Sequence, residues 1–226
     1  MAILDELTRP DVEGADPPLL LVPVGSVEQH GAHLPLGTDT IVAVALAQAI
    51  ARSRDNAVVA PPLGFGASGE HQGFSGTLSI GTDVLAAVLT EVVRSARSWC
   101  QGVVIVSGHG GNAVALQRAS QRGKVEGDEV LVVAASVPGA DAHAGRTETS
   151  LLLALAPGLV RENEAVPGVT QPLSEIFETL RRDGVKAVSP NGVLGDPTGA
   201  SADEGVAIFA ELVTQATHAV SERFPR

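Results

Sequence analysis

The sequence predicts an α/β fold in which a mostly parallel sheet is flanked by helices. Short runs of branched apolar residues alternate with longer Ala-rich segments along the 226 residues, and this alternation is typical of a parallel sheet covered by helices. Each short run is apolar at nearly every position, as a strand buried on both faces would be. Polar segments rich in histidine follow these runs. In open α/β sheets ligands bind outside the carboxyl ends of the strands, so the same pattern locates the site.

Four apolar runs are the predicted strands, at residues 19–24, 57–60, 103–107 and 130–134. Segments with the length and spacing of helices lie between and after them, at residues 39–52, 82–99, 112–123, 147–156, 173–182 and 202–222. Asp39, Thr82 and Asn112 stand where N-caps are expected. Two Pro- and Gly-rich segments, 61–81 and 189–199, are predicted to be long functional loops. Neither resembles a linker, so residues 1–226 are expected to form one domain.

Composition excludes several classes of protein. The charge sum of −11, with scattered basic residues, argues against binding to nucleic acid or to an anionic membrane. No run approaches about 18 apolar residues and the first residues are acidic, so we expect a soluble, cytoplasmic protein. A single cysteine, Cys100, cannot form an internal disulfide or a thiolate cluster, and it is expected to act as a small buried hydrophobe. Any metal must therefore bind His, Asp and Glu.

Aromatic residues are scarce: five Phe, one Trp and no Tyr, or 3% of the chain. Binding by stacked bases or in a Trp-lined pocket is therefore not expected. The core must be built from Ala, Val and Leu.

Five side chains near the predicted strand ends form a nitrogen and oxygen ligand set. Glu28 and His30 are one residue apart, so in an extended segment both point the same way. Asp39 begins the next helix, where a rigidly held carboxylate could bridge two ions. His109 directly follows the third strand and Glu148 opens the helix after the fourth. Each has a plain alternative, a surface histidine or an N-cap, but their joint position favours a site for Zn, Mn or Fe(II).

A site with two ions indicates hydrolysis, because two ions activate a shared water and hold a scissile carbonyl. The departing nitrogen also needs a proton donor. His143 and His71 have no predicted ligand role and are the candidates. His143 is preferred since it lies on the same loop as Glu148, and a structural histidine is the alternative for each.

The segment GHGGN follows the third strand. Gly-rich turns there also bind phosphates, but this one lacks the P-loop lysine and the dinucleotide spacing. Gly110 and Gly111 are instead expected to let the backbone approach metal or substrate. Asn112 caps the helix or binds a substrate carbonyl. No G-x-S-x-G segment indicates a nucleophilic serine.

Five segments resemble the creatininase family of metal-dependent amidohydrolases: PVGSVEQHGAHLPLGTD, GEHQGFSGTLS, SGHGGN, HAGRTETS and GDPTGASADEG. The resemblance extends from about residue 19 to the last helix. It implies one α/β domain in a homo-oligomer, such as a hexamer, with a two-metal centre that hydrolyses a C–N amide bond. The implied ligands are Glu28, His30, Asp39 as the bridge, His109 and Glu148.

Two departures from the family pattern bear on substrate and metal. Creatininase has a glutamate two positions after the histidine that matches His109, and here that position is Gly111, which changes the coordination of one metal. Creatinine hydrolysis is associated with tryptophans that close over the ring, whereas this chain has only Trp99, predicted to lie on a helix away from the site. Creatinine is therefore a poor candidate substrate.

The short chain and the GHGGN segment are most similar to a branch of the family that acts in cofactor maturation. That resemblance implies removal of the C-terminal Val-Tyr dipeptide from a modified precursor peptide, with Fe(II) and Zn as the metals and Mn as a further candidate. Arg146 is the basic residue inside the motifs and is expected to pair with a substrate carboxylate or with neighbours of Glu148. A hydrolase for a cyclic amide such as creatinine, or for a formamide, is the rival. A noncatalytic metal-binding partner in maturation is the alternative from another class.

Overall fold

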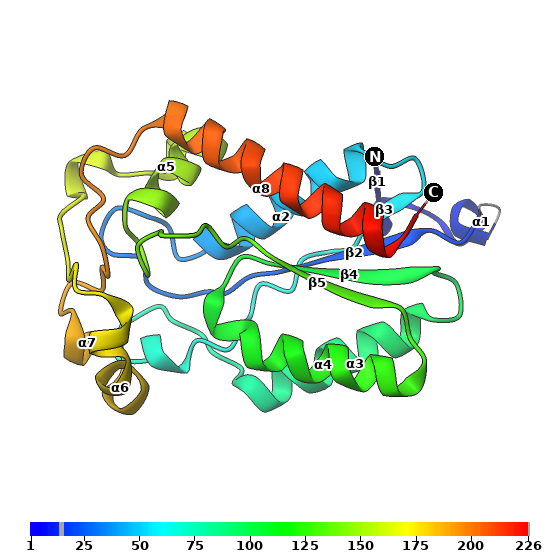
Figure 1. The fold of residues 1–226 in the computed structure, drawn as a ribbon, viewed down its shortest axis with the longest axis horizontal. Helices are drawn as coiled ribbons and strands as arrows, with labels where there is room; N and C mark the ends of the chain where they lie inside the picture. The colour runs from blue at the N-terminus through cyan, green and yellow to red at the C-terminus, as the bar shows by residue number, and fades with distance from the viewer. Residues whose placement is uncertain (14–15, 226) are drawn as a thin grey trace.

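The computed structural model describes residues 1–13 and 16–225, and a five-stranded parallel sheet lies at its centre (Figure 1). The strands are β1 (Ala2–Ile3), β2 (Leu19–Val24), β3 (Ala57–Val59), β4 (Gly102–Ser107) and β5 (Val130–Ala134), in the spatial order β1-β3-β2-β4-β5. All neighbouring strands pair in parallel. The predicted parallel α/β architecture is confirmed. Strand β1 was not predicted, because two residues are too few to show a pattern.

The sheet is flanked by α-helices and short 3-10 turns. The helices are α1 (Arg9–Glu13), α2 (Thr38–Arg52), α3 (Thr82–Ala96), α4 (Ala113–Glu126), α5 (Arg146–Leu155), α6 (Leu173–Asp183), α7 (Val185–Val188) and α8 (Ala202–Arg223). The 3-10 turns are η1 (Leu4–Glu6), η2 (Gly69–His71), η3 (Gly110–Asn112), η4 (Pro157–Leu159) and η5 (Glu162–Glu164). Among the described residues, no helix is both long and apolar enough to cross a membrane.

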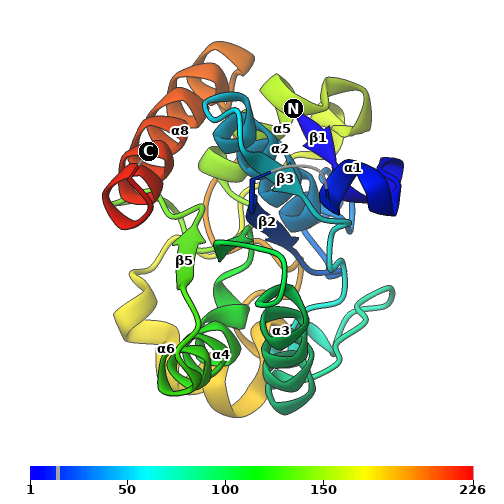
Figure 2. The same ribbon diagram turned by 90° about the vertical axis from the view of Figure 1, so that its right-hand side faces the viewer.

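Alternate residues of the central strands enter two separate cores. Leu19 and Leu21 of β2 pack in the core under α2, α5 and α8, whereas Leu20 and Val22 pack in the core under α3 and α4. Figures 1 and 2 show these two helix layers on opposite faces of the sheet. Both faces are covered, which is why the sequence of β2 reads as an unbroken apolar run.

Two of the predicted N-caps are wrong. Helix α2 starts at Thr38 and α3 at Thr82, and the cap positions are Gly37 and Gly81. Asp39 is therefore the second residue of its helix, and its carboxylate does not cap the backbone. The Asp39 carboxylate is therefore available for contacts outside the helix.

Helices α6 and α7 lie beyond the end of the sheet and form a small third core with the loop that precedes α8 (Figure 1). Ile176, Val185 and Leu194 are the buried residues of this core. It holds α6 against η2, the turn in the loop after β3. A wall is thereby built over the carboxyl ends of the strands.

Candidate metal centre

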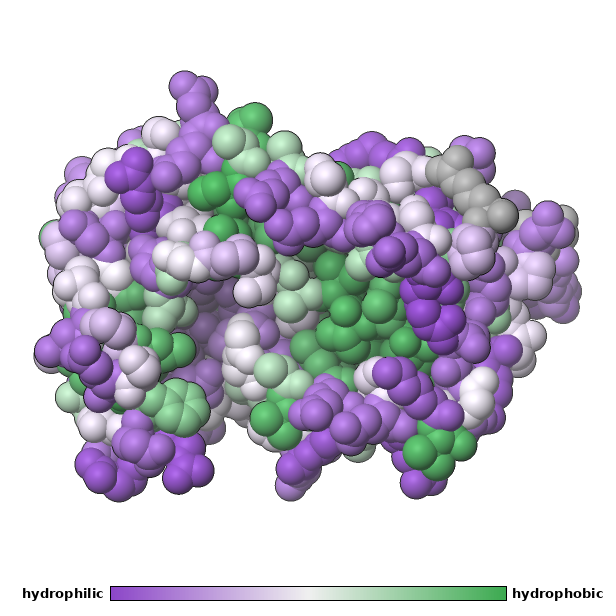
Figure 3. All heavy atoms as spheres, viewed as in Figure 1, coloured by the Kyte–Doolittle hydropathy of each residue, from purple (hydrophilic) through white to green (hydrophobic). Residues whose placement is uncertain are grey.

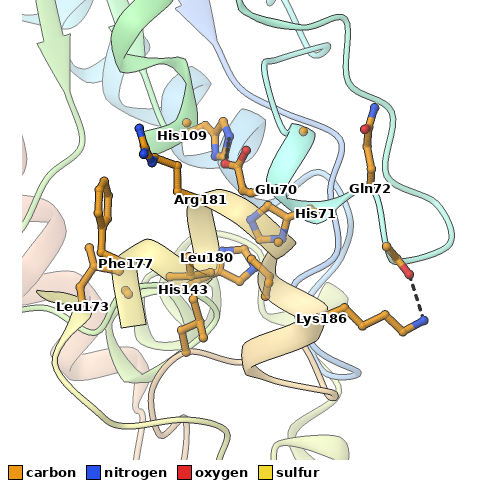
Figure 4. A pocket seen from close by; sticks show the side chains of 18 of the residues that line it. Glu70, His71, Gln72, His109, His143, Leu173, Phe177, Leu180, Arg181 and Lys186 are labelled. Atoms are coloured by element: carbon orange, nitrogen blue, oxygen red, sulfur yellow. Dashed lines mark hydrogen bonds and ion pairs between the residues drawn. The ribbon is translucent and has the colours of Figure 1, made fainter. Parts of the chain in front are cut away.

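The segments that follow β2, β4 and β5 form the floor of a cavity of about 920 Å³. Turn η2 and helix α6 supply its walls. Figure 4 shows His71, His109 and His143 in one region of this cavity, with side chains of α6 beside them. Residues from loops far apart in the sequence thus meet where the fold predicts a ligand site.

Asp39 lies between two imidazoles. Its Oδ1 is 3.2 Å from Nε2 of His30, and its Oδ2 is 3.3 Å from Nδ1 of His109. All three side chains are buried. One carboxylate oxygen therefore faces the ligand candidate after β2, and the other faces the candidate after β4.

Glu28 is fully buried and faces the same floor. Its Oε2 lies 3.1 Å from Nε2 of His109, and its Oε1 lies 3.4 Å from Nε2 of His71. Neither Glu28 oxygen, nor Oδ2 of Asp39, has a partner in hydrogen-bonding geometry. Buried carboxylate oxygens without partners are costly, and coordination of a cation would satisfy them.

Three groupings of side chains place one donor atom each within 4.8 Å of one another and could hold an ion. They are Glu28, Asp39 and His109; His30, His143 and Glu148; and Glu28, His71 and His143. All the donors are imidazole nitrogens and carboxylate oxygens, which suit Zn and similar divalent metals. The residues present fit a divalent metal centre, and the first two groupings contain the five ligands implied by the resemblance.

Glu148 approaches the floor from the first turn of α5. Its Oε2 lies 3.9 Å from Nε2 of His30 and accepts a hydrogen bond of 2.6 Å from the backbone N–H of Ala144. Ala144 is buried and has a φ of 52°, in the left-handed region that residues other than glycine seldom adopt. The Glu148 carboxylate thus helps to hold a strained turn directly after His143.

The carboxylates shift the proton affinity of both floor imidazoles. Burial acts to lower the pKa of His30, but the charge of Asp39 outweighs it and raises that pKa to about 10. His109 is buried too, yet its contact with Asp39 raises its pKa to about 9. Burial, assisted by Asp39, raises the pKa of Glu28 to about 7. Without metal the floor therefore retains protons that incoming cations would displace.

The two predicted proton donors lie in the cavity and are buried. Burial lowers the pKa of His71 to about 3, with positive His109 nearby adding to the effect, and burial lowers the pKa of His143 well below its ordinary value. Both rings are thus neutral near pH 7. A neutral ring donates from one nitrogen only, so the position of its proton decides what it can do.

Gln29 contacts both rings and determines where their protons lie. Its Nε2 donates to Nδ1 of His71 at 3.0 Å and to the carbonyl oxygen of Gly192 at 2.9 Å. Its backbone carbonyl accepts from Nε2 of His143 at 2.7 Å. His71 consequently carries its proton on Nε2, whereas His143 turns an unprotonated Nδ1 toward Glu28, 3.6 Å away. Gly192 has a φ of 82°, and a Cβ there would overlap the Gln29 side chain.

The GHGGN segment does two different things. Gly110 and Gly111 line the cavity, where the sequence placed them. Asn112 is fully buried; its Oδ1 accepts from the Ala67 N–H at 2.9 Å, and its Nδ2 donates to the Gly25 carbonyl oxygen at 3.0 Å. Both polar atoms of Asn112 are occupied, and its side chain does not cap α4. Asn112 thus ties together the loops after β2, β3 and β4, and a role in substrate binding stays a prediction.

Arg146 does not line the cavity. Its Nε lies 2.9 Å from both carboxylate oxygens of Glu204 on α8. Its guanidinium thus connects α5 to α8, and pairing with a substrate carboxylate stays a prediction. The basic residues that line the cavity belong to α6 and α7: Arg181, Arg182 and Lys186.

Three contributors to the site were not predicted: Gln29, which contacts the cavity-lining His71, and the cavity-lining Glu70 and face of α6 that bears Leu173 and Phe177. Gln29 lies between the predicted ligands Glu28 and His30, and this position in the sequence was the only indication that it belongs to the site. Glu70 directly precedes His71 and offered a similar signal. Helix α6 was predicted as a helix, but its place over the floor depends on long-range packing.

Comparison with known proteins agrees with the resemblance. The chain matches the Creatininase family, described as creatinine amidohydrolase, over residues 5–220. It is 53% identical over 201 residues, 87% of this chain and 81% of the relative, to the mycofactocin precursor peptide peptidase of Mycolicibacterium smegmatis. It is 29% identical to the creatinine amidohydrolase of Pseudomonas putida, over 92% of this chain and 90% of that protein.

Solved structures give the same result. A structure named "Creatininase Mn" superposes with a TM-score of 0.81 at 27% identity, covering 100% of this chain and 99% of that one. A variant creatininase of the Zn-Zn type also has a TM-score of 0.81 at 27% identity, over 99% of this chain and 98% of that one. Fold, candidate ligands and sequence all agree, and the chain belongs to the creatininase family.

Proposed function

We propose that this protein is a metal-dependent peptidase that releases the C-terminal Val-Tyr dipeptide from the modified mycofactocin precursor peptide. The observation that carries the hydrolytic part is the placement of Asp39 between His30 and His109, with unpartnered Glu28 oxygens beside them. The substrate is supported by the relative at 53% identity, which is named for that peptide. The similarity to the creatinine amidohydrolase is much lower, at 29%.

The cavity supports a peptide better than a small flat ring. Trp99 lies beyond the end of α3, packs against the core under α3 and α4, and is not among the cavity-lining residues. The walls carry half-exposed apolar side chains instead: Val114, Leu173 and Phe177. Such walls admit an extended chain and bind its apolar side chains.

The residues divide the chemistry between them. Glu28, His30, Asp39, His109 and Glu148 would hold two divalent ions. When bound, such ions lower the pKa of water and polarise a carbonyl. His71 is neutral near pH 7 and presents an Nε2–H toward the site. To protonate the departing nitrogen it would first take up the proton that the attacking water loses, so that it donates as a cation and returns to the neutral ring. His143, the other proposed donor, offers a lone pair on Nδ1 and is suited to orient the floor.

We further propose Fe(II) and Zn as the metals, with Mn as a substitute. The support is the nitrogen and oxygen donor set, since Cys100 packs partly buried against the core under α3 and α4 and does not line the cavity. Elemental analysis of protein purified without added metal tests the pair. Zn alone, bound to full occupancy with full activity, would contradict the need for iron.

We also propose that residues 1–226 act as one domain within a homo-oligomer, such as a hexamer. Figure 3 shows an apolar surface between α8 and α4, in the region of β5. β5 is at the end of the sheet order, and its Leu131 and Val132 are only partly buried. An apolar edge of this kind is commonly covered by another chain. Light scattering of the purified protein gives the mass directly, and a monomer at micromolar concentration would refute the proposal.

A competition assay tests the function. The modified precursor peptide, creatinine and simple formamides are incubated with the enzyme, with and without a chelator, and products are identified by mass spectrometry. Release of the dipeptide fragment, lost with the chelator, is expected. Hydrolysis of creatinine in preference to the peptide would overturn the proposed substrate. Metal binding without hydrolysis of any substrate would indicate a noncatalytic partner.

A further inference from the structure

Position 111 has no side chain, and a carboxylate from another loop lies where one would begin. A Cβ atom on Gly111 would overlap Nε2 of His109, and it would lie 2.5 Å from Oε1 of Glu70 and 2.7 Å from the carbonyl oxygen of Ala67. The glycine thus leaves the space in which His109 and Glu70 approach each other. No other residue type fits position 111 without displacing one of them.

Glu70 reaches this space from the middle of η2. Its Oε1 lies 3.6 Å from Nε2 of His109, and its side chain is 34% exposed, toward the cavity that it lines. Figure 4 shows the Glu70 carboxylate beside the His109 ring. Glu70 therefore contacts His109 from the cavity side, while the fully buried Glu28 lies 3.1 Å from the same Nε2 atom.

Charge favours a fourth carboxylate here. Two divalent ions would bring four positive charges, and the ligand candidates Glu28, Asp39 and Glu148 supply three negative ones. Glu70 belongs to none of the groupings that could hold an ion, yet it is adjacent to a histidine that does. A carboxylate beside the ring nitrogen that does not bind the metal orients the ring and strengthens its hold on the metal. Nδ1 of His109 lies 3.3 Å from Oδ2 of Asp39 and would face the ion, which leaves Nε2 for Glu70.

We propose that Glu70 is a positioning residue of the metal centre, which acts through His109 to hold the ion beside Glu28 and Asp39, and that Gly111 is present to admit it. The inference rests on the proposed metal dependence but not on the proposed substrate. Zn-loaded protein is titrated with a competing chelator, and the two Zn affinities are measured separately. Glu70→Gln should weaken one affinity by about 10- to 100-fold and leave the other unchanged. Glu70→Asp should restore part of the loss.

Two further variants complete the test. Gly111→Ala should weaken the same affinity, because the new methyl group displaces Glu70 or His109. Glu164→Gln is the matched control: it removes an exposed glutamate from another 3-10 turn, η5, and should change neither affinity. The inference is overturned if Glu70→Gln retains both Zn ions with wild-type affinity, or weakens both equally together with a lower melting temperature. Wild-type protein that fails to bind two Zn ions would overturn the proposed function as well.

Discussion

Asp39 and Asp83 occupy the same place in two helices, directly after the threonine that begins each one. Asp83 is exposed and pairs with Arg118, whereas Asp39 is buried between His30 and His109. Identical local sequence, Thr-Asp at a helix start, thus leads to different roles. The difference comes from the strand ends that surround Asp39.

This pair gives a matched test. Asp39→Asn keeps the shape but replaces one charged oxygen by a donor, so the two ligand groupings lose their shared anion. We expect loss of bound Zn and of hydrolysis. Asp83→Asn should keep both, within about 0.5 kcal/mol of wild-type stability. Elemental analysis and melting curves of the two variants provide the comparison, and full Zn content in Asp39→Asn would remove Asp39 from the ligand set.

The histidine pKa values predict how the metal-free protein responds to pH. The pKa values of His30 and His109 are about 10 and about 9 in the folded chain, above the ordinary value of about 6.5 in an unfolded one. A raised folded pKa contributes stability that is complete below pH 6.5 and is lost as pH rises through the folded value. The melting temperature of the chelated protein should therefore fall between pH 7 and pH 10.

Zn-loaded protein is the control for this prediction. Its imidazoles are already free of protons, so its melting temperature should fall less over the same range. Scanning calorimetry of both forms at pH 7 and pH 10 gives the measurement. Equal falls would mean that the two histidines do not account for the loss.

At the scale of elements, helix α6 both packs in the third core and contributes side chains to the cavity that would bind substrate. Ile176 is buried in the small third core, while Leu173, Phe177 and Arg181 are spaced by four residues and line the cavity. Positions i, i+4 and i+8 lie on nearly the same face of a helix, so one face of α6 anchors it and the neighbouring face meets the cavity. Figure 4 shows Leu173 and Phe177 together on this wall.

Phe177→Ala should therefore change substrate preference. We expect kcat/KM to fall about 5- to 10-fold for a peptide with an aromatic C-terminal residue, because apolar contact is lost, and to change little for the same peptide ending in Ala. Phe65→Ala is the matched control, since Phe65 is 52% exposed against 50% for Phe177 and lies outside the cavity lining. An equal fall of kcat/KM for both peptides would show that Phe177 does not contact the C-terminal side chain of the substrate.

The elements that could be predicted are those whose structure is determined by their own residues. β2 and β4 are buried on both faces, so their apolar runs revealed them, and the ligand candidates followed because they directly adjoin strand ends. The proton-setting contact of Gln29 with Gly192 joins positions 163 residues apart, and no local pattern contains it. The predicted N-caps at Asp39 and Thr82 were wrong for a related reason. The cap residues are Gly37 and Gly81, which have no side chain that could mark the start of a helix in the sequence.

At the scale of the whole molecule, the floor of the site buries Glu28 and Asp39 without hydrogen-bond partners for three of their oxygens. Metal and fold should therefore be strongly coupled. Each ion bound at about 1,000 times its dissociation constant contributes roughly 4 kcal/mol to stability.

Chelation should lower the melting temperature accordingly. For a chain of this length, about 4 kcal/mol per ion corresponds to roughly 8 to 16 °C for each ion removed, and about twice that for two ions. Differential scanning fluorimetry before and after treatment with a chelator, and after Zn is restored, measures the change. Restored Zn should recover the melting temperature, and Fe(II) restored together with Zn should recover the cleavage of the peptide. An unchanged melting temperature at complete metal loss would show that the folded floor does not depend on cations.

Gly111 also limits how this enzyme can change. Creatininase carries a glutamate at the matching position, but here any added side chain collides at once with His109, Glu70 and the backbone of residue 67. A single substitution at position 111 therefore cannot convert the glycine form of this site into the glutamate form of creatininase. At least one change in the loop after β3 has to come first. Mutational paths toward the namesake's chemistry, in nature or in directed evolution, begin at residues 67–71.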